Sequence, residues 1–365
     1  MKKGWKIKRL ADVLELQNGY AFDSKGFNPT DGLPLIRIRS LKAGVESETR
    51  FNGEYDRKYV VKAGDLLIGM DGEFGCYEWK GEPSLLNQRV CRLQGFSGEL
   101  IPRFLFYGVN DYLKAIEDVT GYTTVKHISS KQILEIEFPV PPLAEQQRIV
   151  GLLDEAFEGL ATAKANAEKN LQNARALFES HLQSVFTQRG SGWVEKPFED
   201  CIEDVKYTAK IQRKDFLEEG EFPIVSQEAE FTNGYWDNAA DVFKVTRPVV
   251  IFGDHTQVLK YIDFDFVLGA DGVKLLPPKP FLNPKFFFYA LRSAPLKSLG
   301  YARHFRLLKE LLIGYPDMNA QVAIAKNLDS LENETQRLAR LYERKHAALE
   351  ALKKSLLHQA FTGAL

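Results

Sequence analysis

The sequence predicts an α+β protein with pseudo-two-fold symmetry, in which two globular α/β units are joined and separated by two long antiparallel coiled-coil helices. Three observations predict this architecture. A long helical pattern occurs twice, each copy follows a segment broken by Gly and Pro, and each such segment opens with Gly-Trp. The predicted boundaries are 1–140 for the first globular unit, 141–189 for the first helix, 190–315 for the second unit and 316–365 for the second helix.

The helical pattern repeats without a gap, since residues 141–187 can be laid on residues 316–362. The identical pairs are spread along the whole repeat and include Pro141 with Pro316, Gln146 with Gln321, Leu153-Asp154 with Leu328-Asp329, and Phe186-Thr187 with Phe361-Thr362. The chain is therefore interpreted as two half-molecules. A single chain with two-fold symmetry suits a target that also has two parts.

Both globular segments contain short β-rich runs followed by an apolar run of helical character. The β-rich runs include 35–38, 65–68 and 249–252, and the helical runs are 102–107 and 284–289. Each helical run begins with Pro, whose missing N–H group costs nothing at the first position of a helix. The shared order of elements indicates that the two units are diverged copies of one α+β fold.

The repeated segment has the pattern of a coiled coil, with apolar residues on two alternating heptad positions and the same phase in both copies. In the first copy these residues are Ile149, Ala156, Ala163 and Leu177 with Leu153, Leu160, Ala167 and Ala174. In the second copy they are Ile324, Leu331, Leu338 and Leu352 with Leu328, Tyr342, Leu349 and Leu356. Asn170 and Lys345 interrupt the stripe at matching positions, where polar groups are expected to fix the register.

The stripe of the first helix is rich in Ala and that of the second in Leu, which predicts that the two helices pair with each other. A helix of about 44 residues is about 66 Å long, and an antiparallel pair would place the globular units at opposite ends. The alternative is that each helix belongs to the core of its own unit. A seam of 3.5-residue period sustained over this length is uncommon in globular cores.

The composition indicates a cytoplasmic globular protein. The chain has no apolar run of about 18 residues, and its first residues are not followed by the apolar stretch of a signal peptide. Cys76, Cys91 and Cys201 lack CxxC spacing, which predicts reduced thiols and no structural zinc. The 48 Lys and Arg residues are balanced by 49 Asp and Glu residues. Nucleic-acid binding would therefore need localised basic patches or a partner protein.

The motifs of common catalytic sites are absent: the sequence has no GxxxxGK[ST], HExxH, GxSxG or GxGxxG. The tetrapeptide Asn/Asp-Pro-Pro-aromatic of amino-methyltransferases is also missing, since the Pro pairs stand in Val-Pro-Pro-Leu and Leu-Pro-Pro-Lys. Asp71, Asp254 and Asp271 lie near Gly and are interpreted as turn residues rather than catalytic carboxylates. The sequence thus predicts neither an active site nor a metal site.

Two stretches resemble the junction between domain and helix in specificity subunits of type I restriction–modification systems. They are Gly121-Tyr122-Thr123-Thr124-Val125-Lys126-His127-Ile128-Ser129 and Phe138-Pro139-Val140-Pro141-Pro142-Leu143-Ala144-Glu145-Gln146-Gln147. In that family a target-recognition domain ends in a Gly-Thr-containing stretch and meets a helix at a Pro-Pro-Leu-x-Glu-Gln signature. The resemblance covers the whole chain, in the order domain, helix, domain, helix. The second copy departs from it, because 316–321 keeps only the Pro and Gln of the signature and 300–304 lacks the Thr.

The resemblance implies a non-catalytic DNA-recognition subunit. Each recognition domain would read one half of a bipartite site in double-stranded DNA, with the helices as a ruler for the unread spacer. It also implies methyltransferase (M) subunits that carry S-adenosylmethionine, and a restriction/translocase (R) subunit, as partners; no membrane is implied. The alternative from another class is a coiled-coil scaffold whose globular ends bind proteins. A free-standing enzyme is disfavoured by the missing motifs.

Base reading needs Arg, Lys, Asn, Gln or small hydroxyl groups at the base edges, with further basic groups on the phosphates. The candidates in the first unit are Arg37, Arg39, Lys42, Gln88, Arg89, Thr123, Thr124, Lys126 and His127. Those in the second unit are Gln227, His255, Arg303, His304, Arg306 and Lys309. Arg37 and Arg39 are expected to alternate on one strand face and to point the same way. For any single residue the alternative is a solvated charge or a capped turn.

Overall fold

The computed structural model describes residues 4–43, 47–121, 126–270, 272–297, 300 and 302–365. The chain forms two compact units. Unit 1 consists of Met1–Ala165 with His346–Leu365, and unit 2 consists of Asn166–Lys345. Each unit therefore combines one globular segment with the start of one long helix and the end of the other.

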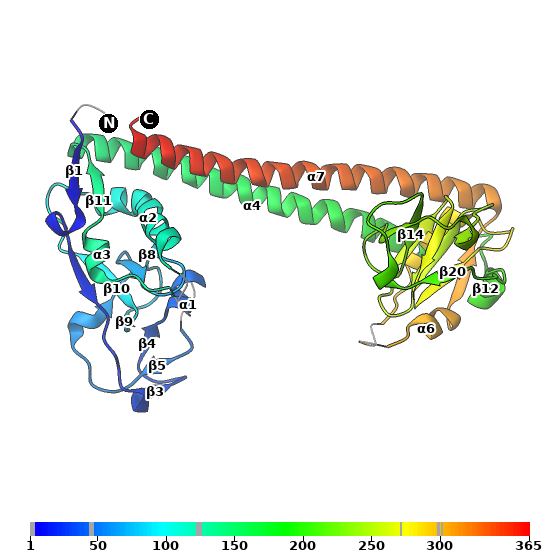
Figure 1. The fold of residues 1–365 in the computed structure, drawn as a ribbon, viewed down its shortest axis with the longest axis horizontal. Coiled ribbons are helices and arrows are strands. Elements are labelled where there is room, and N and C mark those ends of the chain that lie inside the picture. The colour runs from blue at the N-terminus through cyan, green and yellow to red at the C-terminus, as the bar shows by residue number, and fades with distance from the viewer. Residues whose placement is uncertain (1–3, 44–46, 122–125, 271, 298–299, 301) are drawn as a thin grey trace. The chain divides into compact units, whose positions relative to one another are not determined.

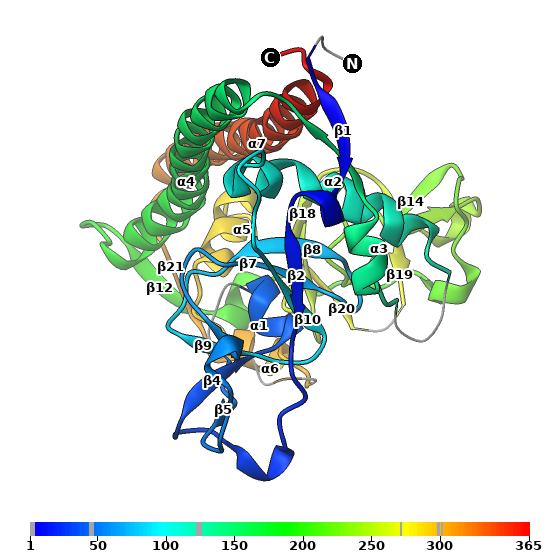
Figure 2. The same ribbon diagram turned by 90° about the vertical axis from the view of Figure 1, so that its left-hand side faces the viewer.

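The globular part of unit 1 is built on three sheets, with strand orders β1-β11, β2-β10-β7-β8 and β3-β5-β4-β9-β6. The strands are β1 (Lys6–Arg9), β2 (Glu15–Asn18), β3 (Phe27–Asn28), β4 (Leu33–Ile36), β5 (Arg50–Phe51), β6 (Val60–Val61), β7 (Leu66–Gly69), β8 (Gly75–Glu78), β9 (Ser84–Leu86), β10 (Val90–Gln94) and β11 (Glu137–Val140). The helices are α1 (Ile38–Ala43), α2 (Pro102–Val119), α3 (Ser130–Leu134) and the start of α4 (Leu143–Thr187). Figure 2 faces this unit and shows the β-sheets below the long helices.

Unit 2 has sheets in the orders β12-β21, β13-β19-β14-β15 with β16 on β19, and β18-β17-β20. The strands are β12 (Val194–Pro197), β13 (Lys210–Ile211), β14 (Phe222–Val225), β15 (Gly234–Trp236), β16 (Val242–Phe243), β17 (Val249–Gly253), β18 (Leu259–Ile262), β19 (Phe266–Gly269), β20 (Val273–Leu276) and β21 (Leu312–Tyr315). The helices are α5 (Pro284–Arg292), α6 (Phe305–Lys309) and the start of α7 (Met318–Thr362).

The two globular parts share their principal pairings, as the shared order of sequence elements predicts. An antiparallel two-stranded sheet joins the first strand to the strand before the long helix in both units, as β1 with β11 and β12 with β21. A parallel pair also recurs, as β4 with β9 and β14 with β19. The apolar runs predicted to be helical are α2 and α5, and each has Pro in its first turn.

One strand prediction is wrong in part. The run 35–38 begins in β4, but the strand ends at Ile36 and α1 begins at Ile38. The Ser40 hydroxyl accepts a hydrogen bond from the Arg37 N–H at 3.0 Å and donates one to the Arg37 carbonyl at 2.8 Å. These local bonds satisfy the backbone at the start of a helix and so favour a turn over a longer strand. Arg37 and Arg39 therefore do not alternate on a strand face.

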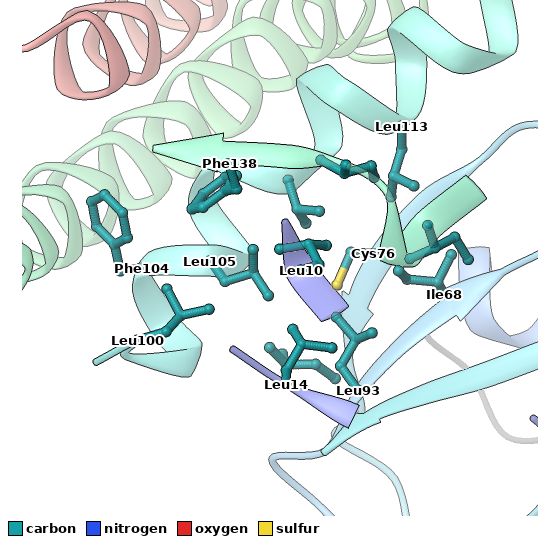
Figure 3. Packing of buried hydrophobic residues seen from close by; sticks show 14 of the residues in the cluster. Leu10, Leu14, Ile68, Cys76, Leu93, Leu100, Phe104, Leu105, Leu113 and Phe138 are labelled. Carbon is teal, nitrogen blue, oxygen red and sulfur yellow. The ribbon is translucent and has the colours of Figure 1, made fainter. Parts of the chain in front are cut away.

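The core of unit 1 lies between the central sheet, α2 and the β1–β11 pair. Figure 3 shows its side chains pointing toward one another, and those labelled are Leu10, Leu14, Ile68, Cys76, Leu93, Leu100, Phe104, Leu105, Leu113 and Phe138. The Trp of each Gly-Trp opening packs on the first turns of the following apolar helix: Trp5 on Phe104 and Trp193 on Phe286. The repeated openings are thus explained by equivalent packing in the two units.

The two long helices are antiparallel partners in both units, which confirms the predicted pairing (Figure 1). In unit 1, Lys164 pairs with Glu350 at 2.8 Å, and the Arg148 guanidinium donates to the Leu365 carbonyl at 2.8 Å. In unit 2, Arg175 pairs with Glu343 at 2.8 Å. The partner's residue number falls as that of α4 rises, as antiparallel packing requires. No described helix is apolar over a length that would cross a membrane.

The end of each long helix packs into the globular core of the unit where the other helix starts. In unit 1, the Phe361 ring near the end of α7 lies 4.9 Å from that of Phe104 and 5.8 Å from that of Phe138. In unit 2, the Phe186 ring near the end of α4 lies 5.3 Å from that of Phe286. The alternative that each helix serves only its own domain's core is therefore wrong.

The predicted seam is wrong by one residue in its later part. Leu177 and Leu352 are 54% and 47% exposed, and Asn170 and Lys345 are also exposed. Phe178 is buried instead, at 4% exposure. An α-helix of 3.6 residues per turn drifts by about 20° per heptad relative to a 3.5-residue repeat, so an apolar stripe moves to the next residue after a few heptads. Asn170 and Lys345 consequently lie outside the seam and do not set its register.

Candidate nucleic-acid interface

A buried glutamine fixes the globular part of each unit to the start of the long helix that follows it. In unit 1 the Gln146 Oε1 atom accepts a hydrogen bond from the Ile101 N–H at 2.8 Å. Its Nε2 group donates to the carbonyls of Glu99 at 2.7 Å and Pro141 at 2.8 Å. One side chain thus satisfies three backbone groups, in the loop before α2 and in the chain entering α4.

Gln321 makes the same three bonds in unit 2. Its Oε1 atom accepts from the Asn283 N–H at 2.8 Å, and its Nε2 group donates to the carbonyls of Phe281 at 3.0 Å and Pro316 at 2.9 Å. Both glutamines are buried. This role explains why the second copy keeps the Gln, because only its side-chain amide can make these three bonds at once.

A second pair of equivalent contacts joins α2 to α4 in unit 1 and α5 to α7 in unit 2. In unit 1, the Tyr107 hydroxyl and the Arg103 guanidinium of α2 both donate to the Asp154 carboxylate of α4. The bond from Arg103 is 3.0 Å long. In unit 2, the Tyr289 hydroxyl of α5 donates to Asp329 of α7 at 2.6 Å. Burial, together with the bond to Asp154, raises the pKa of Tyr107 to about 12. The phenol therefore stays protonated and donating at neutral pH.

The structure brings three of the predicted DNA-binding residues of unit 1 into one surface. Gln88, Arg89 and His127 line an open hollow of about 290 Å³, together with Asn18, Gly19, Met70, Ser129 and Ser130. Gln88 and His127 are distant in sequence, and the backbone of Met70, just after β7, brings their segments together. The Met70 N–H donates to the Arg89 carbonyl, and the Met70 carbonyl accepts from the Ile128 N–H, each at 2.9 Å. We call this surface the Arg89 hollow.

Asp71 ties the Arg89 hollow together. One oxygen of its carboxylate lies 2.6 Å from His127 Nδ1, and the other lies 3.6 Å from Arg89 Nε. Asp71 precedes Gly72, whose φ is 77°, as the predicted Asp-Gly turn requires. Asn18 and Ser129 of the Arg89 hollow, and Asp71 that contacts two of its residues, were not among the residues predicted from the sequence. The Asn-Gly pair at 18–19 and the Ser beside His127 were the available signals.

The other predicted residues of unit 1 have different surroundings. Arg37 and Arg39 are exposed, and the Arg37 guanidinium lies 5.8 Å from the centre of the Phe27 ring. Lys42 pairs with Glu73 at 2.9 Å. The Lys126 ammonium donates to the Glu117 carbonyl at 2.7 Å, where α2 ends, so it serves as a cap for that helix. Thr123 and Thr124 lie outside the described residues.

In unit 2, Gln227 and His255 lie together at the ends of β14 and β17. Gln227 Oε1 accepts from the His255 N–H at 3.2 Å, and the Gln227 carbonyl accepts from the Thr256 hydroxyl at 2.5 Å. A side chain at Gly272 would clash with Gln227, because its Cβ would lie 2.5 Å from Gln227 Oε1. The structure therefore brings together two of the residues predicted to bind DNA, Gln227 and His255, although they are 28 residues apart.

His304 is 1% exposed, so its side chain does not lie on the surface with the other residues predicted to bind DNA in unit 2. Its backbone N–H donates to the Asp254 carbonyl at 2.7 Å, and its Nδ1 atom lies 3.0 Å from the same oxygen. The Asp254 carboxylate accepts from the Phe305 N–H at 2.8 Å. These bonds hold the start of α6 against the end of β17. No pattern in the sequence distinguishes this buried histidine from Arg303 beside it, which is exposed.

The remaining basic residues of the second cluster are exposed around α6. Arg303, Arg306 and Lys309 all face solvent, and Lys309 pairs with Glu199 at 2.7 Å. The ammonium groups of Lys274 and Lys309 lie 5.2 and 5.7 Å from the centre of the Phe305 ring. The arrangement is a basic edge carried by a short helix, which suits contacts to phosphate oxygens more than base reading.

Replacing both Arg303 and Arg306 by Ala is expected to weaken DNA binding at the half-site of unit 2 about tenfold at physiological salt. The reason is that each phosphate contact releases counterions from the DNA, so a variant with fewer contacts gains less from this release. Fluorescence anisotropy of the reconstituted complex on labelled duplexes measures this, and the salt dependence of the affinity should become shallower. Arg213→Ala with Lys214→Ala is the charge-matched control, since both side chains are exposed in the same unit. Unchanged affinity of the first double variant would remove the cluster from the interface.

Comparison with known proteins gives one consistent family. Residues 2–171 match the family model of the type I restriction modification DNA specificity domain. The specificity subunit of the Escherichia coli type I restriction enzyme EcoBI is 38% identical over 186 residues, which cover 51% of this chain and 39% of that protein. The chain thus spans about two fifths of that relative. The MjaVIII specificity subunit of Methanocaldococcus jannaschii is 20% identical over 98% of this chain and 92% of its own.

Solved structures show the same fold along the whole chain. A chain from a structure on complex assembly and conformational transition of a type I restriction–modification system has a TM-score of 0.75 and 19% identity, covering 100% of this chain and 99% of its own. The HsdS subunit from Thermoanaerobacter tengcongensis has a TM-score of 0.59 and 18% identity, covering 100% and 98%. Residues 2–171 and the named relatives thus show that this chain is similar to type I restriction–modification specificity subunits, and its fold resembles that of the HsdS subunit along the whole chain.

Proposed function

We propose that the chain is the DNA-recognition subunit of a type I restriction–modification complex and is not itself an enzyme. Unit 1 reads one half of a bipartite site, unit 2 reads the other, and the helix pair sets the unread spacer. The observation that carries this proposal is the identical mounting of two recognition domains: Gln146 and Gln321 make the same three backbone bonds. Two equally mounted domains with different surfaces suit two short DNA blocks of different sequence.

The proposal includes partners that supply the chemistry. Methyltransferase subunits carry the S-adenosylmethionine, and a restriction/translocase subunit joins them on the DNA. The balanced charge of the chain supports the proposal that partner subunits share the DNA binding. With 48 basic and 49 acidic residues, the chain has no excess of positive charge to neutralise the DNA phosphates. Such a complex works in the cytoplasm, where the DNA is.

The alternative is a coiled-coil scaffold whose globular ends bind proteins. That function would place no demand on the residues of the Arg89 hollow or of the basic edge near α6. The two functions differ in one outcome, since a scaffold has no sequence-selective affinity for DNA even with every partner present.

Modification-sensitive long-read sequencing of the host genome, with the gene intact and deleted, tests the proposal. The expected result is that deletion abolishes adenine methylation at one split motif, two short blocks around a fixed gap. Re-expression of the gene should restore the same motif. If the two genomes are identical, the reconstituted complex with active methyltransferase subunits decides: absence of methylation at any split motif there would contradict the proposed function.

A further inference from the structure

Arg89 has a backbone conformation that arginine rarely adopts. Its φ is 74°, in the left-handed region, and Gln257 is the other non-glycine residue with positive φ in the described part of the chain. Glycine is the usual residue there, because in other residues the Cβ atom crowds the following carbonyl oxygen. A side chain kept at such a position despite this cost points to a use for that side chain.

Unit 2 has glycine at the equivalent corner. In unit 1 the Met70 N–H donates to the Arg89 carbonyl at 2.9 Å, and in unit 2 the Asp254 N–H donates to the Gly272 carbonyl at 2.7 Å. The next residue begins a strand in both units, β10 or β20. Gly272 has a φ of 90°, close to that of Arg89. The corner therefore folds with glycine, and nothing in the backbone requires arginine.

The Arg89 guanidinium is paired with Asp71 only through its Nε atom. Asp71 Oδ2 lies 3.6 Å from Nε, while Asp71 Oδ1 is engaged by His127 at 2.6 Å. The terminal nitrogens Nη1 and Nη2 have no ion-pair partner among the described residues, and the side chain is 58% exposed. A guanidinium that presents its terminal edge matches the paired acceptors O6 and N7 of guanine in the major groove.

We propose that Arg89 is a specificity-determining residue that reads one guanine in the half-site of unit 1, and that Asp71 is the residue that positions it. The inference rests on the proposed function and adds the base and the contact. Gly272 offers no side chain at the matching corner of unit 2, where the Gln227 amide lies instead. The two units thus present different groups at equivalent corners and read different bases.

The first test separates recognition from folding. In the complex with methyltransferase subunits, Arg89→Gly is expected to reduce methylation of the cognate site about tenfold or more, the scale of one bidentate contact. Its melting temperature should stay unchanged or rise, because glycine relieves the left-handed backbone. Arg89→Lys should also lose recognition, since an ammonium lacks the planar fork. Arg9→Ala is the matched control, because Arg9 is similarly exposed, at 61%, and similarly paired, with Asp12.

The second test identifies the contacted base. Replacing the relevant guanine by 7-deazaguanine removes N7 and should impair the wild-type complex about tenfold, whereas inosine, which keeps N7 and O6, should not. The Arg89→Gly complex should not respond to 7-deazaguanine. Asp71→Asn should weaken recognition in the wild type and add nothing in the Arg89→Gly background, which a separate structural role would not produce.

The outcomes distinguish the two proposals. If the wild-type complex methylates no split motif, the proposed function itself fails. If the wild type is active and Arg89→Gly methylates the same motif equally well, only the assignment of Arg89 fails. A parallel loss of melting temperature and methylation in Arg89→Gly would likewise overturn it, since that combination marks a structural residue.

Discussion

Replacing Gln146 by Ala is expected to lower the free energy of unfolding by about 3 kcal/mol, because it removes the buried side chain that satisfies three backbone groups, at about 1 kcal/mol for each lost hydrogen bond. The groups are the Ile101 N–H and the carbonyls of Glu99 and Pro141. Urea denaturation of the full-length chain measures the loss. Hydrogen exchange localises it, because the Ile101 amide should exchange much faster while the Asn283 amide of unit 2 keeps its protection.

The chain offers two controls for this prediction. Gln147 is the adjacent glutamine and is exposed, so Gln147→Ala should change the free energy of unfolding by less than about 0.5 kcal/mol. Gln321→Ala should reproduce the effect in unit 2, where the Asn283 amide loses its partner. Equal stability of the Gln146 and Gln147 variants would contradict the role assigned to the buried side chain.

Replacing Phe178 by Ala is expected to cost about 3–4 kcal/mol, the usual range for removing a buried aromatic ring. Phe178 is 4% exposed, its ring centre lies 6.1 Å from that of Tyr289, and the Arg292 guanidinium lies 4.6 Å from it. The neighbouring Leu177→Ala should change stability by less than about 0.5 kcal/mol, since that side chain is 54% exposed.

This pair of variants tests the helix seam directly, because a strict heptad assigns the buried position to Leu177. Urea denaturation of the two full-length variants gives the comparison. A larger loss for Leu177→Ala than for Phe178→Ala would restore the heptad assignment and refute the observed drift. A polar register role for Asn170 would be refuted by the same drift, since Asn170 and Leu177 occupy the same heptad position.

The architecture could be predicted because its signals are long and repeated. A sustained apolar heptad pattern without Pro predicts a long helix, and α4 and α7 are each 45 residues long. Pro102 and Pro284 marked helix starts, because Pro is tolerated at that position and costly further inside. Small residues on one stripe and large ones on the other identified the partner helix.

Individual site residues were harder to predict, because burial and partners decide their roles. Lys126 and His127 are adjacent in sequence, yet one caps α2 and the other contacts Asp71 at the Arg89 hollow. His304 and Arg303 are adjacent as well, and one is buried while the other is exposed. No composition or spacing separates such neighbours, since the direction of each side chain depends on the backbone path after β7 or β17.

The two-fold repeat, the extent of the long helices and their pairing can be predicted from the amino-acid sequence, because they follow from apolar periodicity and from the near absence of helix breakers. Which segments combine into each unit is seen only in the folded chain. The bonds of Gln146 and Gln321 reach back to Ile101 and Asn283, and the rings of Phe186 and Phe361 enter cores that begin far away in the chain. Such contacts depend on non-local packing, where the gain from burial and satisfied backbone groups outweighs any local preference.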